Sequence, residues 1–149
     1  MPTLVTAIDD TVEVEYGQFL VQEIPMTRNV LTLPVPRGDW FAVGGPGGLL
    51  LHSAGTDHHP AVRLELWDAD PLPRPGEWDR VVEVACDLGD LVRLQSVTAA
   101  RSPQVLTISR PGPHRARVHS GRRVAAAELG EGSFAAGVEG WLVQLWPGA

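Results

Sequence analysis

The sequence predicts an all-β protein, a single antiparallel β-sandwich of about eight to ten strands with one short helix near residues 121–130. Short segments in which apolar and polar residues alternate recur along the chain, and this period of two is typical of half-buried strands. The 13 prolines and 16 glycines fall mainly between these segments, where they favour turns. A length of 149 residues fits one domain, spanning residues 1–149.

The first alternating segment, TVEVEYGQFLVQE (11–23), is expected to place Val12, Val14 and Tyr16 on one face, with a bulge at Gly17. Further strands are predicted in WFAVGG (40–45), GGLLLHSA (47–54), AVRLELWD (61–68), DRVVEVACDL (79–88), DLVRLQSV (90–97), PQVLTISR (103–110), HRARVHS (114–120) and GWLVQLWP (140–147). The helix is predicted in SGRRVAAAELGEG (120–132), because alanine and leucine favour helix and Ser120 is suited to cap its start.

Composition restricts the classes of protein to which the chain can belong. Hydrophobic residues make up 44% and charged residues 20% of the chain, values that are ordinary for a soluble globular protein. No apolar run approaches the length of about 20 residues that a membrane-spanning helix needs, and the chain starts without a signal-peptide pattern. The lone Cys86 leaves no internal disulfide and is expected as small apolar filling. We therefore expect a cytoplasmic protein with no membrane contact.

Basic residues are concentrated late in the chain. Residues 91–127 hold seven of the 12 arginines and no acidic residue. Within PGPHRARVHSGRR (111–123), a strand would place Arg115, Arg117 and His119 on one face, with Arg122 and Arg123 following at its end. These five residues are candidates for partner binding, because guanidinium groups pair with carboxylates and phosphates.

Three interpretations of this basic strand remain open. It is either a solvated face paired with acidic neighbouring strands, a docking site for an acidic protein, or a site for a phosphate or nucleic acid backbone. A net charge of −6 and a pI of about 5.2 argue against nucleic acid, which basic domains usually bind.

A second cluster lies in LHSAGTDHHP (51–60), where His52, Asp57, His58 and His59 are candidate metal ligands. Their spacing matches no characteristic ligand pattern, and an exposed polar loop is the better explanation of the cluster. The chain lacks a nucleophile elbow, a His-Glu-x-x-His helix and a phosphate-binding lysine loop. These missing motifs favour a non-catalytic protein without a cofactor, and a metal-dependent enzyme at this loop is the alternative.

The chain resembles the competence protein J group, small all-β proteins that inhibit a DNA-entry nuclease. VEYGQFLVQ, AVRLELW, WDRVVEVACDL and RPGPHRARVH occur in the corresponding order and span most of the chain. The resemblance implies an all-β protein that acts by binding another protein, a nuclease or a toxin. The acidic first 90 residues suit this function, since a negative surface speeds association with a basic partner. We therefore expect an inhibitor or immunity-like protein whose partner the sequence does not identify.

Overall fold

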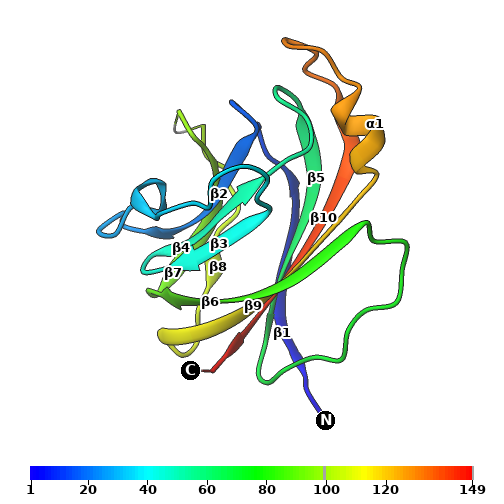
Figure 1. Cartoon of the computed structure of the whole chain (residues 1–149). Helices are drawn as coiled ribbons and strands as arrows, with labels where there is room; N and C mark the ends of the chain where they lie inside the picture. Colours follow the sequence, from blue (N-terminus) through cyan, green and yellow to red (C-terminus); the bar gives the residue numbers. More distant parts are fainter. Residues whose placement is uncertain (99, 149) are drawn as a thin grey trace.

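Two facing β-sheets form the body of the protein (Figure 1). The computed structural model describes residues 1–98 and 100–148. One sheet has the strand order β1-β5-β10-β9-β6 and the other β3-β4-β2-β7-β8. The predicted all-β fold with one short helix is confirmed. Over the described residues the elements are β1 (Leu4–Thr11), β2 (Gln18–Ile24), η1 (Val30–Thr32), β3 (Ala42–Gly45), β4 (Gly48–His52), β5 (His59–Trp67), β6 (Arg80–Leu88), β7 (Leu91–Ser96), β8 (Leu106–Thr107), β9 (Gly112–Gly121), α1 (Arg123–Ala127) and β10 (Ala136–Pro147).

The first predicted strand differs from the structure. Strand β1 precedes it, and β2 begins only at Gln18. The chain between them turns at Tyr16 and Gly17, whose φ angles are 55° and 74°. Val12 and Val14 are buried as expected, but the turn carries Tyr16 to the outside, where 74% of it is exposed. The residue predicted to form a bulge, Gly17, is therefore part of a turn.

The first sheet contains one parallel pair, which the prediction of a purely antiparallel sandwich did not include. Strand β10 lies between β5 and β9, antiparallel to β9 and parallel to β5. Its 12 residues make it long enough to pair with both neighbours along most of their length. The alternation of side chains along β10 places Trp141, Val143 and Leu145 in the core.

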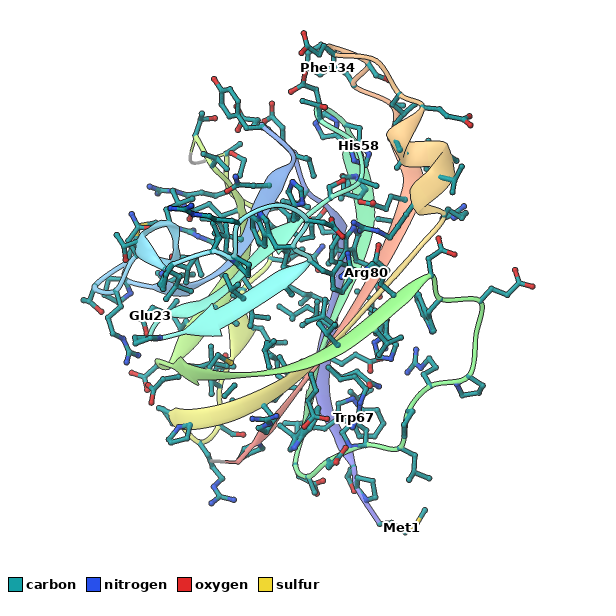
Figure 2. The ribbon with its side chains drawn as sticks, in the orientation of Figure 1. Met1, Glu23, His58, Trp67, Arg80 and Phe134 are labelled. Carbon is teal, nitrogen blue, oxygen red and sulfur yellow. The ribbon has the colours of Figure 1, made fainter. Side chains whose placement is uncertain are left out.

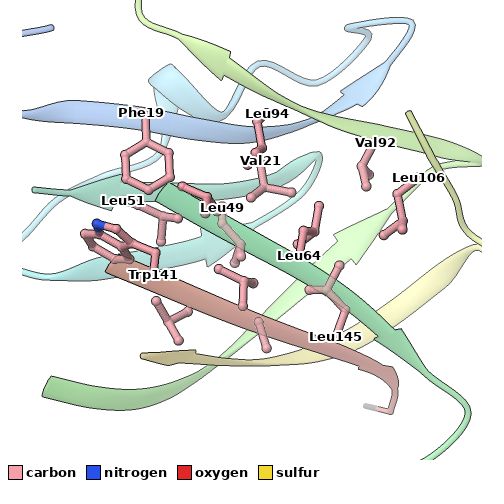
Figure 3. Packing of buried hydrophobic residues seen from close by; sticks show 14 of the residues in the cluster. Phe19, Val21, Leu49, Leu51, Leu64, Val92, Leu94, Leu106, Trp141 and Leu145 are labelled. Carbon is pink, nitrogen blue, oxygen red and sulfur yellow. The ribbon is translucent and has the colours of Figure 1, made fainter. Parts of the chain in front are cut away.

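The core fills the space between the sheets with apolar side chains from both (Figure 3). The Phe19 ring meets the Trp141 ring edge to face, with 5.0 Å between the ring centres, and the Phe41 ring stacks on Trp141 at 5.1 Å. Leu49, Leu64 and other aliphatic residues continue the cluster along the sandwich. Cys86 lies in this core and is 6% exposed, as its predicted role as apolar filling requires.

Helix α1 falls within the predicted window, but it begins differently. Ser120, the predicted cap, is buried in β9. Arg122 occupies the capping position in a left-handed conformation, with φ 59°, and makes no side-chain capping bond. Within the described residues, no helix is long and apolar enough to cross a membrane.

Candidate functional site

The basic strand predicted from the sequence is β9. Its side chains alternate as expected, since Ala116 and Val118 lie in the core while Arg115, Arg117 and His119 point to the other face of the sheet. That outer face is not open to solvent. Arg117 is only 8% exposed and His119 only 1%.

Arg117 is held beneath the segment that links β5 to β6. Its Nη1 donates a hydrogen bond of 2.8 Å to the Pro71 carbonyl oxygen, and its Nη2 lies 3.0 Å from Asp70 Oδ1. Its guanidinium also lies over the Trp146 ring, 4.8 Å from the ring centre. The linking segment therefore covers this part of the outer face and neutralises its charge.

The neighbouring basic side chains are also engaged. The His119 ring packs 5.2 Å from the Trp78 ring, and its Nδ1 lies 3.1 Å from the Leu142 carbonyl oxygen. Burial lowers the pKa of His119, which favours the neutral imidazole. Arg115 pairs with Glu83 at 3.2 Å across the strands. The alternation of residues predicted a continuous, solvent-exposed basic face. Strand β9 does not form one.

Arg122 and Arg123 lie at the end of β9 and point in different directions. Arg122 is exposed. The Arg123 guanidinium is turned inward, 3.4 Å from the buried Glu139 carboxylate, and its backbone N–H donates to Asp79. Of the five predicted residues, Arg122 and the partly exposed Arg115 remain accessible to a partner, and their role in binding stays a prediction.

The four predicted metal ligands do not converge. The His52 ring stacks on Trp40 with its Nδ1 3.0 Å from the Trp40 carbonyl oxygen. Asp57 caps a backbone amide of the loop after α1, His58 is buried, and His59 is half-buried at the start of β5. In the described ranges, no group of three or more His, Cys, Asp or Glu side chains is arranged to hold a metal ion.

A buried carboxylate that the sequence did not single out organises this end of the sandwich. Glu139 of β10 has no exposed side-chain surface, and its two oxygens accept hydrogen bonds from four groups. Ser53 Oγ donates at 2.7 Å, Trp141 Nε1 at 2.6 Å, the Ala54 amide at 2.9 Å and Arg123 at 3.4 Å. Glu139 therefore ties α1 and the loop after β4 to β10.

His58 extends the same network. Its Nε2 lies 2.7 Å from Ser53 Oγ. Because the serine hydroxyl donates its proton to Glu139, the imidazole donates to the serine, and the tautomer is fixed with the proton on Nε2. Burial lowers the pKa of His58, so the ring is neutral. A nucleophilic serine would instead donate to its histidine. This arrangement positions loops and does not activate the hydroxyl.

The same end carries an exposed acidic and aromatic surface, which we call the acidic end and define as Glu15, Tyr16, Asp57, Glu131 and Phe134. The first four of these residues line a hollow of about 310 Å³ together with Thr56. The loops are tied together, since the amide of Gly132 donates to Asp57 Oδ2 at 3.0 Å. Phe134 lies on the same loop, at the opposite end of the molecule from Met1 and Trp67 (Figure 2).

Both aromatic residues of the acidic end are exposed and conformationally strained. Tyr16 is 74% and Phe134 63% exposed, and their φ angles are 55° and 54°. A left-handed conformation is costly for bulky side chains and is usually occupied by glycine or asparagine. Beside them, burial acts to raise the pKa of Glu15, but hydrogen bonds from Thr98 and Ser96 outweigh it and lower the pKa, which keeps the carboxylate charged.

The sequence pattern did not indicate these two aromatic residues as binding residues. The alternation predicted Tyr16 on the same face as Val12 and Val14, and Phe134 follows the predicted helix window, 120–132, in no predicted element. The available signal was a lone phenylalanine between glycines, where no strand or helix periodicity explains it.

Comparisons with known proteins give a likeness in structure but not in sequence. No family model matches the chain, and no curated protein matches it. In structure it is similar to ComJ from Bacillus subtilis, an inhibitor of the DNA-degrading activity of NucA, with a TM-score of 0.60 and 11% identity over 99% of both chains. It is also similar to the product of crocagin biosynthetic gene J, with a TM-score of 0.64 and 13% identity over 97% of this chain and 98% of that one. The resemblance to the competence protein J group expected from the sequence is therefore confirmed as a likeness of fold.

Proposed function

We propose that this chain is a non-catalytic binding module, one β-sandwich domain of the cytoplasm that inhibits a nuclease or toxin by docking its acidic end onto a basic surface. The likeness of fold to ComJ, a nuclease inhibitor, supports this class of function. The observation that carries the proposal is the pair of strained, exposed aromatic residues Tyr16 and Phe134. Backbone strain at residues whose side chains do not pack in the core is typical of functional positions.

The chemistry of the acidic end suits a basic partner. Exposed tyrosine and phenylalanine rings supply contact area at low entropic cost, and aromatic residues are frequent at the energetic centres of interfaces. Glu15, Asp57 and Glu131 line one hollow with Tyr16, and no arginine is among its lining residues. Proteins that bind DNA carry basic surfaces, so an acidic surface of this kind attracts a nuclease and blocks its substrate.

The proposal is tested with NucA, the nuclease whose DNA-degrading activity ComJ inhibits, and with any nuclease that a neighbouring gene encodes. The DNA-degrading rate of the nuclease is measured against added wild-type protein and a Tyr16→Ala/Phe134→Ala variant. We expect stoichiometric inhibition by the wild type, with affinity that falls as salt rises. The variant should bind at least about tenfold more weakly, because two central aromatic contacts are lost.

An exposed apolar residue outside the acidic end provides the matched control. Val35 is 44% exposed and lies outside the acidic end, so Val35→Ala should inhibit as the wild type does. Equal inhibition by the aromatic variant would show that docking occurs elsewhere. Absence of inhibition by the wild type would remove the proposed function.

A further inference from the structure

Another hollow lies at the C-terminal end of β10 and has a volume of about 540 Å³. Its lining consists of two carboxylates, one guanidinium group, one tryptophan, three prolines, one alanine and one glycine. Figure 1 shows this end of β10 far from α1, and thus far from the acidic end, to which the loop after α1 belongs. The proposed inhibitor surface therefore does not use this hollow.

The charged groups of the lining come from two sides of β10, which lies between β5 and β9 in the sheet. Asp68 and Asp70 follow the end of β5, just before the proline-rich segment 71–75, whereas Arg110 precedes the start of β9. Neighbouring strands lie about 4.8 Å apart, so β5 and β9 are separated by about 10 Å. Negative and positive groups thus flank a space that one small molecule is able to span.

The charges next to this space are paired within the fold. Asp70 Oδ1 lies 3.0 Å from Arg117 Nη2. Arg115, from the same strand as Arg117, is paired with Glu83 at 3.2 Å. These pairs leave one carboxylate and the guanidinium group of the lining to be accounted for.

Asp68 and Arg110 keep their charges available to a ligand. Asp68 Oδ1 accepts a hydrogen bond of 2.7 Å from the Thr3 backbone N–H, but no ion pair among the described residues involves Asp68 or Arg110. Both side chains are exposed and line the hollow, so a molecule within it reaches their charged groups. Opposite charges that do not meet across one hollow complement a ligand that carries both an ammonium group and a carboxylate.

The space between these charges has an apolar lining. Pro111, Pro113 and Pro147 contribute their rings, and Trp146 adds its indole. The Arg117 guanidinium lies over the indole, 4.8 Å from the ring centre, and holds it in place. Proline has no side-chain freedom to lose, so contact with these rings costs little entropy. The lining therefore suits an apolar side chain placed next to the two charges.

From these features we infer that the hollow binds a free α-amino acid with an apolar side chain. The ammonium group of the ligand donates to Asp68, its carboxylate accepts from Arg110, and its side chain contacts the prolines and Trp146. A volume of about 540 Å³ accommodates such a molecule, since small-molecule sites commonly measure about 300 to 1,000 Å³. Binding here is independent of the proposed inhibition, which uses the acidic end.

Three probes that differ at their charged groups test both contacts. L-Phenylalanine carries both charges, N-acetyl-L-phenylalanine lacks the ammonium group, and L-phenylalaninamide lacks the carboxylate. Binding is followed by NMR through the Trp146 indole N–H signal, at a mildly acidic pH where the free amines of the probes are protonated. L-Phenylalanine should bind about threefold to fivefold more tightly than either analogue, because each analogue loses one exposed ion pair.

The two exposed charged residues provide the variants. Asp68→Asn keeps an oxygen to accept from Thr3, and it should remove the discrimination against N-acetyl-L-phenylalanine alone. Arg110→Gln should remove the discrimination against L-phenylalaninamide alone. Glu77→Gln and Arg37→Gln, at exposed residues outside the hollow, should leave all three affinities unchanged.

Equal affinity for the three probes would overturn the inference, because the two charges would then play no part in binding. Loss of both discriminations in a single variant, or of either one in the controls, would overturn it too. The same holds if L-phenylalanine at millimolar concentrations leaves the Trp146 signal unshifted. None of these results depends on the inhibition assay.

Discussion

Replacement of Glu139 by glutamine tests whether the buried network holds the acidic end together. The substitution keeps the shape of the side chain and removes its charge. In the wild type, Oε1 accepts from Ser53 Oγ and Trp141 Nε1, and Oε2 accepts from the Ala54 amide and Arg123. Glutamine keeps one of these two acceptors, so the other pair of donors faces an amide N–H₂ group and loses its acceptor.

The expected cost follows from the burial of the partners. The Arg123 side chain is 13% exposed, and burial lowers its pKa, which the nearby Glu139 partly offsets. Removal of one partner from a buried ion pair usually costs about 3 to 5 kcal/mol. Arg123 keeps its contact with the Phe41 ring at 4.9 Å, and glutamine keeps one acceptor, so the lower value of about 3 kcal/mol applies. For a chain of this size, this corresponds to a Tm lower by about 6 to 12 °C.

Urea unfolding followed by tryptophan fluorescence measures this cost, with Glu131→Gln as the matched control. Glu131 is exposed at the acidic end, so its substitution should change the free energy of unfolding by no more than about 0.5 kcal/mol. If Glu139→Gln is as stable as this control, the carboxylate does not organise the loops and the reasoning fails.

Three further predictions concern strain, protonation and the thiol. Tyr16→Gly should be more stable to urea than Tyr16→Ala by about 1 kcal/mol, because only glycine adopts φ 55° without strain, and equal stabilities would contradict this. Burial lowers the pKa of His58, so on acidification His58 takes up its proton at a higher pH in the unfolded chain than in the folded protein. The free energy of unfolding should therefore decline as the pH falls below 6.5. His58→Gln should reduce this slope, and an unchanged slope would exclude His58 as its source. Burial raises the pKa of Cys86 to about 12, so an aromatic disulfide reagent should label the thiol in urea and leave the native protein unlabelled.

The alternation of residues predicted most strands because one face of each packs on the core. Strand β1 was missed for a physical reason. It lies at the edge of its sheet and buries little apolar surface, with Leu4 and Val5 exposed and Ile8 its one buried apolar residue within the described chain. A strand with so few buried positions shows no period of two.

The sequence pattern also indicates which side chains point away from the core, but not which segments cover them. Arg117 was correctly placed on the outer face of β9, yet the Pro71 carbonyl oxygen that accepts its hydrogen bond lies 46 residues away. The proline-rich segment contains turn signals and no indication of the sheet face it crosses. The buried network was missed for the same reason, because Ser53 and Glu139 are 86 residues apart.

Ion pairing within the fold explains where the net negative charge acts. The arginines that form ion pairs in the described chain are Arg28, Arg63, Arg74, Arg80, Arg115, Arg117 and Arg123. Of the seven arginines in the basic stretch 91–127, three form such pairs, Arg115, Arg117 and Arg123, so folding neutralises part of its charge. Glu131 and Asp57 form no ion pair among the described residues, and they line the same hollow as the exposed Tyr16. These carboxylates keep their charge available at the acidic end, so salt should weaken the proposed docking of a basic partner there.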